Sequence, residues 1–298
     1  MANHGETERH LVRLFTEAKV FTYEGVKYEI LIIGKPRPSK GECKTDIYIL
    51  CRDDFENNTE FKVSIKQSDA DFLENKMTYD RAVEIFGDDA DKILSESILK
   101  IKQSFEKEPL INFSKFKRTE ANCIKIGWKF ELLNKPGGDK SSELILNNEQ
   151  KIDVYSGSNL NASKRNCNVN GRLIEDSGVA NFIIEVDNIV EDLNYYINKL
   201  EDINSYAVEQ RIYFACKALN YRVEANKWDG DRPLSVYCNW SLNDDNKIEV
   251  QIIFDKPLQV KGNVIGNNIR NLLDKLNINS ENFTSIKSHL SSSVNLYE

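Results

Sequence analysis

Two short stretches near the start of the chain decide how its first part folds. Residues 44–51 read Lys-Thr-Asp-Ile-Tyr-Ile-Leu-Cys, and residues 61–67 read Phe-Lys-Val-Ser-Ile-Lys-Gln. The second stretch alternates apolar and polar residues, which predicts a strand with Ser64 and Lys66 on the same polar face. The first stretch is apolar on both faces after Asp46, a pattern typical of a central strand. The polar connection between them predicts that the two strands pair as a hairpin.

This hairpin would bring together residue types suited to hydrolysing a phosphodiester. Such a reaction needs a metal to neutralise charge on the phosphate, an activated water and a positioned backbone. Mg²⁺ prefers oxygen ligands and commonly uses one or two carboxylates, with water and phosphate oxygens completing its shell. We therefore expect Asp46 to bind Mg²⁺, Lys66 to orient or help deprotonate the attacking water, and Ser64 to support the metal or its water shell.

The spacing of these residues resembles the PD-(D/E)xK nuclease superfamily, because Asp46 is followed after 17 residues by Ser64-x-Lys66. The expected order of a helix, strands and a second helix is also similar to the core of that superfamily. More narrowly, Gly-x-x-Lys-Thr-Asp at residues 41–46 and Ile-Lys-x-Ser at residues 65–68 resemble certain type II restriction endonucleases. The resemblance implies an α/β (α+β) fold with a mixed central β-sheet flanked by helices.

The sequence departs from the superfamily pattern at two positions. Thr45 stands where proline is usual, and Ser64 stands where a second acid is usual, which removes a charged metal ligand. The family often supplies a further glutamate from a helix. The resemblance therefore implies Glu17 as a catalytic residue and second metal ligand, with Glu8 and Glu29 as alternatives.

Periodicity and turn residues predict the remaining elements. Strands are expected over residues 20–23, 26–33, 46–51, 61–67, 179–186, 234–240 and 248–254, within a β region that also covers 122–155. Helices are expected over residues 6–20, 68–76, 78 onward, 88–107, 187–200, 205–219, 267–276 and 281–290. Residues 156–172 are expected to form a long polar loop.

The length of 298 residues suits one large domain or two modest ones. We expect residues 1–110 to form the catalytic nuclease core. Residues 111–298 would form a DNA-recognition or accessory region, or complete the same domain. The soft boundary is expected near residues 106–120, where a helical run gives way to basic residues.

Composition excludes several other classes of protein. The three histidines are scattered, so catalysis centred on histidine is not expected. The six cysteines are scattered without a C-x-x-C pair, which argues against a zinc site or a disulfide framework and fits reduced thiols in the cytoplasm. No apolar run approaches the roughly 18 residues that a membrane helix needs. We therefore expect a cytoplasmic protein with no membrane partner.

Two segments are candidates for contacting DNA, although the net charge of −7 argues against general adhesion to nucleic acid. Residues 98–130 carry a net charge of +5, which suits phosphate contacts or a solvated helix face. Residues 156–172 lack acids and are rich in Asn, Arg and Lys, which suits base readout or a flexible surface loop. The residues expected to contact DNA are Lys44, Gln67, Lys115, Lys117, Arg118, Lys164, Arg165, Arg172 and Arg232.

The sequence thus predicts a sequence-specific, Mg²⁺-dependent type II restriction endonuclease that hydrolyses double-stranded DNA. Such an enzyme implies a DNA methyltransferase as a functional partner, and it acts as a homodimer or as a monomer. One alternative is a nuclease of the same superfamily that acts in repair or phage defence without fixed sequence specificity. Another is a non-catalytic DNA-binding protein on a decayed nuclease core, which the missing acid at Ser64 favours.

Overall fold

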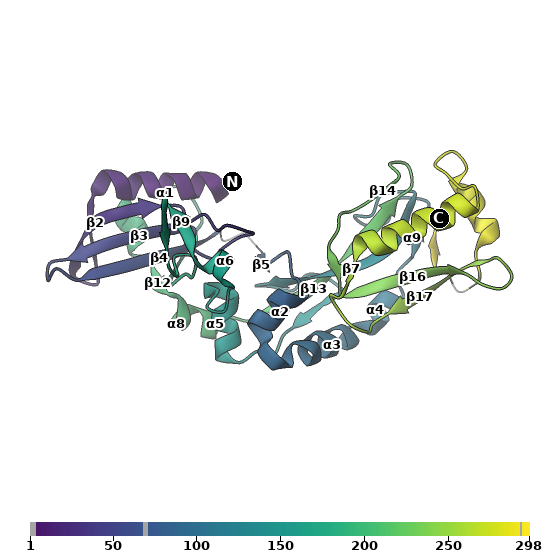
Figure 1. Ribbon diagram of the computed structural model, residues 1–298, viewed down its shortest axis with the longest axis horizontal. Coiled ribbons are helices and arrows are strands. Elements are labelled where there is room, and N and C mark those ends of the chain that lie inside the picture. The colour runs from purple at the N-terminus through teal and green to yellow at the C-terminus, as the bar shows by residue number, and fades with distance from the viewer. Residues whose placement is uncertain (1–3, 68–70, 293) are drawn as a thin grey trace. The chain divides into compact units, whose positions relative to one another are not determined.

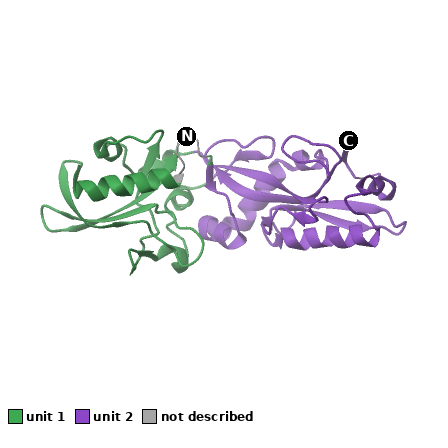
Figure 2. Ribbon diagram, turned by 90° about the horizontal axis from the view of Figure 1, so that it is seen from above, with its two compact units in different colours: residues 1–71, 146–210 green, residues 72–145, 211–298 purple. Residues whose placement is uncertain are grey.

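The chain folds into two compact units, each built from two separated stretches of sequence (Figures 1 and 2). The computed structural model describes residues 4–67, 71–292 and 294–298. Unit 1 comprises residues 1–71 and 146–210, and unit 2 comprises residues 72–145 and 211–298. The chain is therefore divided differently from the expected segments 1–110 and 111–298, and the expected boundary near 106–120 lies inside unit 2.

Unit 1 is an α+β structure around one mixed sheet. Its elements are α1 (His4–Ala18), β1 (Val20–Tyr23), β2 (Val26–Gly34), β3 (Ile47–Asp53), β4 (Asn58–Gln67), α5 (Asn148–Ser156), α6 (Ala162–Arg165), β9 (Cys167–Val169), β10 (Arg172–Ile174), β11 (Phe182–Val186), α7 (Leu193–Ile197), β12 (Glu201–Asp202) and α8 (Ile203–Glu209). The sheet has the order β1-β2-β3-β4-β11-β12, and only the pair β4–β11 is parallel. Parallel neighbours need a crossover connection, and α5 lies in it.

Helix α1 covers one face of this sheet (Figure 1). Its apolar residues pack with the alternate apolar residues of β4 in a single hydrophobic core, which includes Leu11, Leu14, Phe15, Phe61, Val63 and Ile65. The alternation expected for residues 61–67 is therefore confirmed. The other face is covered as well, because Tyr48 and Ser64 are 1% and 2% exposed. Helix α8 contacts β11 on that side and packs against α5.

Unit 2 is a second α+β structure, with a larger sheet. Its elements are β5 (Phe72–Glu74), α2 (Tyr79–Phe86), η1 (Gly87–Asp89), α3 (Ala90–Lys100), α4 (Lys102–Glu106), β6 (Ile111–Asn112), β7 (Cys123–Leu133), β8 (Ser141–Glu143), β13 (Tyr213–Arg222), β14 (Lys227–Trp228), β15 (Pro233–Leu234), β16 (Val236–Leu242), β17 (Ile248–Ile253), β18 (Val260–Lys261), α9 (Gly262–Lys275), η2 (Phe283–His289) and β19 (Leu296–Tyr297). The main path of the sheet is β14-β13-β7-β16-β17.

Strand β7 is the centre of unit 2. Trp128 is fully buried on it, and its ring lies 4.9 Å from that of Phe105. A Cβ atom at Gly127 would lie 2.4 Å from the carbonyl oxygen of Val236. Glycine is therefore required where β16 approaches β7.

Several predicted elements are confirmed in type and place. The expected α+β class with mixed sheets flanked by helices is correct. Thr78 caps α2, because its Oγ1 accepts a hydrogen bond from the Arg81 amide at 3.1 Å. Helices α3 and α4 lie within the expected helical run, and α9 extends the expected helix toward its N-terminus. Among the helices of the described ranges, none is long and apolar enough to cross a membrane.

Two predicted helices are wrong because strand pairing overrides local propensity. The expected helix 205–219 ends at Glu209, and residues 213–222 form β13, which pairs with β7 along its length. Of the expected helix 68–76, Ser68 and its two successors lie outside the described residues, and Phe72–Glu74 forms β5 beside β7. The expected helix 187–200 shortens to α7, and that at 281–290 is the 3₁₀ helix η2.

The expected β region and the expected polar loop are also corrected. Residues 148–156 form α5 rather than strand. A capping box explains the start of this helix, since Asn147 and Gln150 exchange side chain-to-backbone hydrogen bonds. The segment 156–172 contains α6, β9 and the start of β10 instead of an unstructured loop.

Candidate active site

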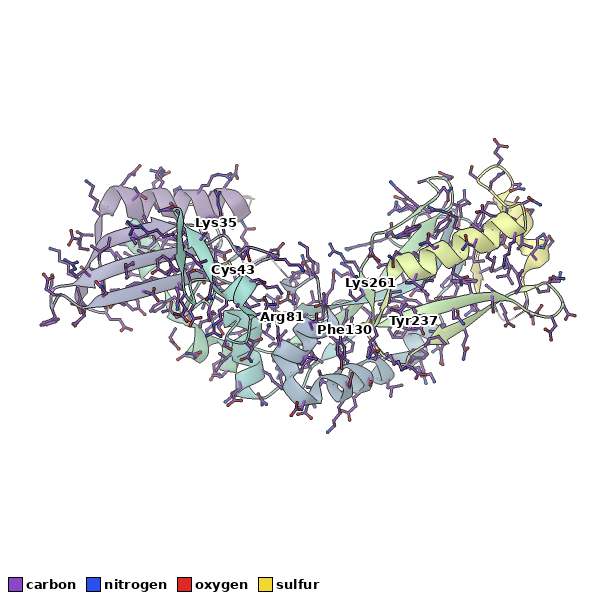
Figure 3. All side chains as sticks on the ribbon, viewed as in Figure 1. Lys35, Cys43, Arg81, Phe130, Tyr237 and Lys261 are labelled. Carbon is purple, nitrogen blue, oxygen red and sulfur yellow. The ribbon has the colours of Figure 1, made fainter. Side chains whose placement is uncertain are left out.

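A pocket of about 470 Å³ lies at the end of the unit 1 sheet, where β2 ends and β3 begins. It is lined by the start of α1 and the connection between the two strands. The lining residues are Glu8, Lys35, Pro36, Arg37, Pro38, Gly41, Glu42, Cys43, Thr45 and Asp46. Lys35 and Cys43 are labelled in Figure 3. Asp46 therefore faces a concave surface, as a metal-binding carboxylate should.

Asp46 is fixed against the neighbouring strand by two hydrogen bonds. Its backbone amide donates to the Val63 carbonyl at 2.9 Å, and its Oδ2 accepts from the Ile65 amide at 2.7 Å. The side chain is half-buried. The carboxylate is thus held at the point of β4 that lies between Ser64 and Lys66.

The hairpin brings Asp46 beside Ser64. Ile47 pairs with Val63, and the Asp46 amide also donates to the Val63 carbonyl, so Asp46 lies just outside the last pair of the ladder, next to residues 63–65. Lys66 follows two residues later and shares the face of Ser64, because Ile65 between them points into the core. Ser64 is buried and Lys66 is half-buried, and both lie outside the lining of the pocket. The three residues expected to form the site are therefore neighbours, with Asp46 between the pocket and the other two.

The acid that α1 contributes to the pocket is Glu8. Glu8 is 5% exposed and lines the pocket, whereas Glu17 pairs with Arg13 at 3.0 Å on the solvent side of the helix. Nine residues of helix separate the two by about 13.5 Å along the axis and by half a turn around it. Glu29 is exposed on β2 and does not line the pocket either. Glu8 shares a stripe with Leu11 and Phe15, a spacing from which its burial could have been predicted.

Lys35 is the ion-pair partner of Glu8 in this pocket. The Lys35 side chain is 54% exposed, whereas that of Glu8 is 7% exposed. The pair therefore joins a buried carboxylate to an exposed ammonium group. Lys35 lies in the basic connection after β2, where no motif in the sequence marks it as a functional residue.

Gln67 ties the end of β4 to the start of α1. Its Nε2 donates to Thr7 Oγ1 at 3.4 Å, and Thr7 is fully buried. Thr7 precedes Glu8 in the sequence, so this contact helps to set the position of the helical acid. Gln67 was expected to contact DNA. In the structure its side chain makes this hydrogen bond within unit 1.

Glu185 is a further acid beside Lys66 that sequence analysis did not identify. The parallel register of β11 and β4 pairs Glu185 with Lys66, on the face opposite the core. Glu185 Oε1 accepts a hydrogen bond from the Tyr206 hydroxyl at 2.6 Å. Burial, this hydrogen bond and the charge of Glu185 raise the pKa of Tyr206. Asp46 and Glu185 therefore flank β4 from its two neighbouring strands.

The segment expected to be a DNA-reading loop is tied to the pocket instead. Arg37 and Asn168 exchange two backbone hydrogen bonds of 2.9 Å, and Asn170 Nδ2 donates to the Ile33 carbonyl at 2.7 Å. The side-chain oxygen of Asn168 accepts a hydrogen bond from the Gly171 amide, and that of Asn166 accepts one from the Asp176 amide just beyond the segment. These amides stabilise the fold, so few of them remain as candidates for base readout.

The basic residues of unit 1 that were expected to contact DNA have different surroundings. Arg165 is held by Asp176 through two nitrogens and donates to the Ser158 carbonyl at 2.6 Å. The hydrogen bond from Arg165 is the main reason why the pKa of Asp176 is lowered. The stem of Lys164 lies over Gly41, next to the pocket, and Arg172 is exposed. The stem of Lys44 packs against Gly157 at the end of α5.

The remaining expected DNA contacts lie in unit 2. Lys115, Arg118 and Arg232 are exposed there, and Lys117 pairs with Asp139 at 3.0 Å. The nine residues expected to contact DNA are thus divided between the two units.

The donor set at the pocket suits a hard divalent cation. Glu8 and Asp46 supply two carboxylates to one concave surface, and Mg²⁺ needs only one or two with water and phosphate oxygens. Among the residues that the structure describes, no group of three His, Cys, Asp or Glu side chains is arranged to hold a metal ion. No protein-family model, curated protein or solved structure matches the chain.

Proposed function

We propose that unit 1 is the catalytic part of a Mg²⁺-dependent, sequence-specific DNA endonuclease of the type II restriction class. One observation carries the proposal. The Asp46 carboxylate, at the rim of a pocket, accepts a hydrogen bond from the Ile65 amide at 2.7 Å, between Ser64 and Lys66. A carboxylate held in this way can bind the metal for hydrolysis of a phosphodiester, and a lysine beside it can act on the attacking water.

The order of elements around the hairpin supports the same proposal. Helix α1 precedes the antiparallel strands β2, β3 and β4, and α5 follows them within unit 1. The helix expected directly after β4 is not formed at Phe72–Glu74, which is β5, so α5 would have to take the place of the second helix in the order that resembles PD-(D/E)xK nucleases. Residues 72–145 are inserted between β4 and α5, so the second helix is far away in sequence but belongs to the same unit.

Each side chain has a proposed role in the reaction. Asp46 and Glu8 would hold Mg²⁺, which supplies positive charge for the phosphate when it is bound. Lys66, on the face of β4 beside Asp46, orients the attacking water and takes part in its deprotonation. Ser64 hydrogen bonds to water next to Asp46. Lys35, which is the ion-pair partner of Glu8, is exposed enough to contact a phosphate of the substrate.

The substrate proposed for this site is double-stranded DNA. Lys164 beside the pocket and exposed Arg172 would contact it from unit 1. Lys115, Arg118 and Arg232 would contact it from unit 2. A homodimer would present two such sites to a palindrome, and a DNA methyltransferase would protect the host sequence.

The proposal is tested by incubating plasmid DNA with Mg²⁺ and comparing the wild type with Lys66→Ala and Asp46→Ala. Discrete fragments that both substitutions abolish are the expected result. The matched control is Lys62→Ala, four residues away on the same face of β4, where Lys62 pairs with Glu60 at 3.6 Å. This control should cut like the wild type.

Three outcomes separate the proposal from its rivals. Unchanged cutting by the Lys66 or the Asp46 variant would overturn the assignment of the site. Smeared products in place of discrete fragments would indicate a nuclease without fixed specificity, acting in repair or phage defence. No cutting of any DNA, together with binding that does not need Mg²⁺, would indicate a non-catalytic DNA-binding protein.

The non-catalytic alternative is favoured by two specific observations. Ser64, at the position where the superfamily usually has an acid, is 2% exposed. Glu8, the acid in the pocket that could take the role of the missing acid, is already paired with Lys35.

Circular dichroism of each variant shows whether lost cleavage reflects a change at the site or a loss of the fold.

A further inference from the structure

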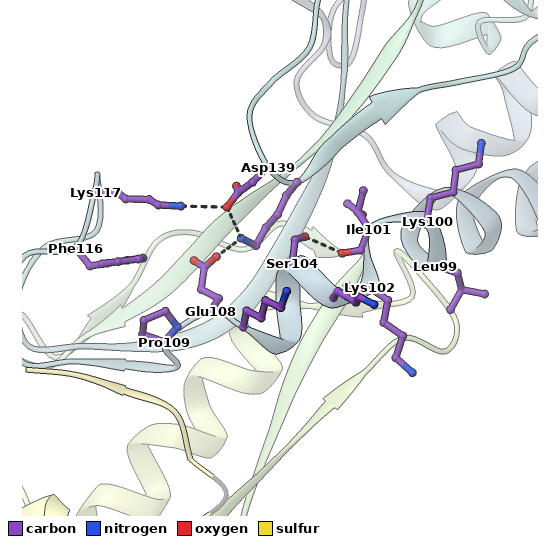
Figure 4. Close-up of a pocket in the computed structure, with 13 residues that line it drawn as sticks. Leu99, Lys100, Ile101, Lys102, Ser104, Glu108, Pro109, Phe116, Lys117 and Asp139 are labelled. Atoms are coloured by element: carbon purple, nitrogen blue, oxygen red, sulfur yellow. Dashed lines mark hydrogen bonds and ion pairs between the residues drawn. The ribbon is translucent and has the colours of Figure 1, made fainter.

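Unit 2 contains a pocket of about 780 Å³ whose charge is opposite to that of the pocket in unit 1 (Figure 4). It is formed by the end of α3, by α4 and by the segments around residues 116–117 and 139–140. Its charged lining residues are Lys100, Lys102, Lys107, Lys117 and Lys140, against Glu108 and Asp139. The pocket therefore concentrates positive charge in a chain whose net charge is −7.

The Glu108 carboxylate in the lining is shared by two buried lysines, of which Lys140 lines the pocket and Lys125 lies behind it. Lys125 Nζ lies 3.2 Å from Glu108 Oε1, and Lys140 pairs with the other oxygen of Glu108. The side chains of Lys125 and Lys140 are 1% and 8% exposed, so both ammonium groups are largely removed from water. Buried charge is costly unless it is paired. An anion in the pocket would lie next to Lys140, in a lining whose five lysines outnumber its two carboxylates.

The second carboxylate, Asp139, is shared between two lysines. Its Oδ2 lies 3.0 Å from Lys117 Nζ and 3.7 Å from Lys140 Nζ (Figure 4). Burial raises the pKa of Asp139, but the hydrogen bond from Lys117 and the charge of Lys140 outweigh it and leave the pKa below its ordinary value. The net field at this point of the pocket is therefore positive.

The remaining lysines of the lining are available to a ligand. Within the described parts of the chain, neither Lys100 nor Lys107 forms an ion pair. Lys102 pairs with Glu106 at 3.6 Å, but both side chains are about half exposed and solvent screens such a pair. These three ammonium groups can turn toward an anion at little cost.

Phosphate groups fit this arrangement best. Each phosphate offers several acceptor oxygens, and lysines bind it as mobile point charges. The volume lies in the range of small-molecule sites. The rings of Pro109 and Phe116 add an apolar surface to the lining, on which a planar base can lie. We propose that this pocket binds a small ligand that carries a chain of phosphates, such as a nucleoside triphosphate.

The proposal is tested by calorimetric titration of the full chain with inorganic tripolyphosphate and with ATP, without divalent metal and at low salt. The double variant Lys100→Ala/Lys107→Ala should weaken binding of both probes by roughly tenfold or more, because charge-assisted contacts are lost. The matched control is Lys275→Ala, an exposed lysine of α9 in the same unit that does not line the pocket. It should bind like the wild type.

The proposal would be overturned if neither probe showed saturable binding. It would also be overturned if the double variant and Lys275→Ala lost the same amount of affinity for the probes. Binding of duplex DNA with neither small probe would also overturn it, because the pocket would then be part of a DNA-binding surface. This inference does not rest on the proposed endonuclease activity. The titration needs neither Mg²⁺ nor cleavage, so its failure leaves that activity untouched.

Discussion

The pocket of unit 1 and the pocket of unit 2 differ in how their buried charges are paired. In unit 1 the acid Glu8 is buried, and its partner Lys35 is 54% exposed. In unit 2 both signs are buried, because Lys125, Lys140 and the Glu108 carboxylate that they share are 1%, 8% and 11% exposed. An exposed partner is screened by water, so the acid dominates in unit 1, whereas in unit 2 two ammonium groups share one carboxylate. The first pocket therefore suits a cation and the second suits an anion.

The largest effect is expected from removing the shared carboxylate of unit 2. Glu108→Gln leaves two buried ammonium groups without their main partner, which should lower the free energy of unfolding by about 3–5 kcal/mol. Glu8→Gln in unit 1 should cost less, because its ion-pair partner Lys35 is exposed and returns to water. Urea unfolding of the two variants measures the difference. Equal losses in the free energy of unfolding would show that the two pockets do not differ in how their charges are buried.

Asp46→Asn should separate the chemistry of the two pockets. Asparagine still accepts the hydrogen bond from the Ile65 amide, so the fold is kept while the negative charge is lost. Cleavage of DNA should fall at least about a hundredfold, and binding of tripolyphosphate in unit 2 should stay at the wild-type level. Initial cleavage rates and the titration are measured on the same preparation. Loss of both activities would mean that the two sites are not independent.

The cores of the two units, unlike their pockets, should respond alike to pH. Burial raises the pKa of Cys51 in unit 1 and of Cys216 in unit 2 to about 12. The thiols ionise more easily in the unfolded chain than in the folded protein. Their contribution to the free energy of unfolding is therefore complete below the ordinary thiol pKa of about 8.5 and declines above it. Stability should therefore fall between pH 9 and 10, by about 1 kcal/mol for each thiol. Cys51→Ala and Cys216→Ala should each flatten this slope in urea unfolding.

The smallest effect is expected from Lys35→Ala. Removing the ammonium group takes away a positive charge that competes with a cation at the Glu8 carboxylate, so the Mg²⁺ concentration for half-maximal cleavage should fall by about threefold. The Mg²⁺ dependence of the cleavage rate at saturating DNA measures this shift. Arg13→Ala, which removes the partner of exposed Glu17 on the same helix, is the control and should change nothing. A higher Mg²⁺ requirement in Lys35→Ala would exclude Glu8 as a ligand.

Sequence periodicity was sufficient to predict the hairpin that holds Asp46, Ser64 and Lys66. Its alternating strand has one apolar face, and that face forms the core beneath α1. Glu17, the helical acid expected from the resemblance, does not line the pocket, for a related reason. The helix was predicted. Glu8 lies three and seven residues before the apolar residues Leu11 and Phe15, and this spacing places it on the buried face of the helix that lines the pocket. Glu185 could not be chosen in advance, because nothing local indicates which strand pairs with β4.

The sequence by itself determined the local elements, above all the two faces of residues 61–67 and the capped start of α2 at Thr78. A period of two or an N-cap is encoded within a few consecutive residues, so it can be recognised without the fold. Only the tertiary structure decided that residues 72–145 are inserted into unit 1, that β13 is a strand, and that one pocket is acidic while the other is basic. These features depend on which distant surfaces bury one another, and that choice is made by packing and strand pairing across the whole chain.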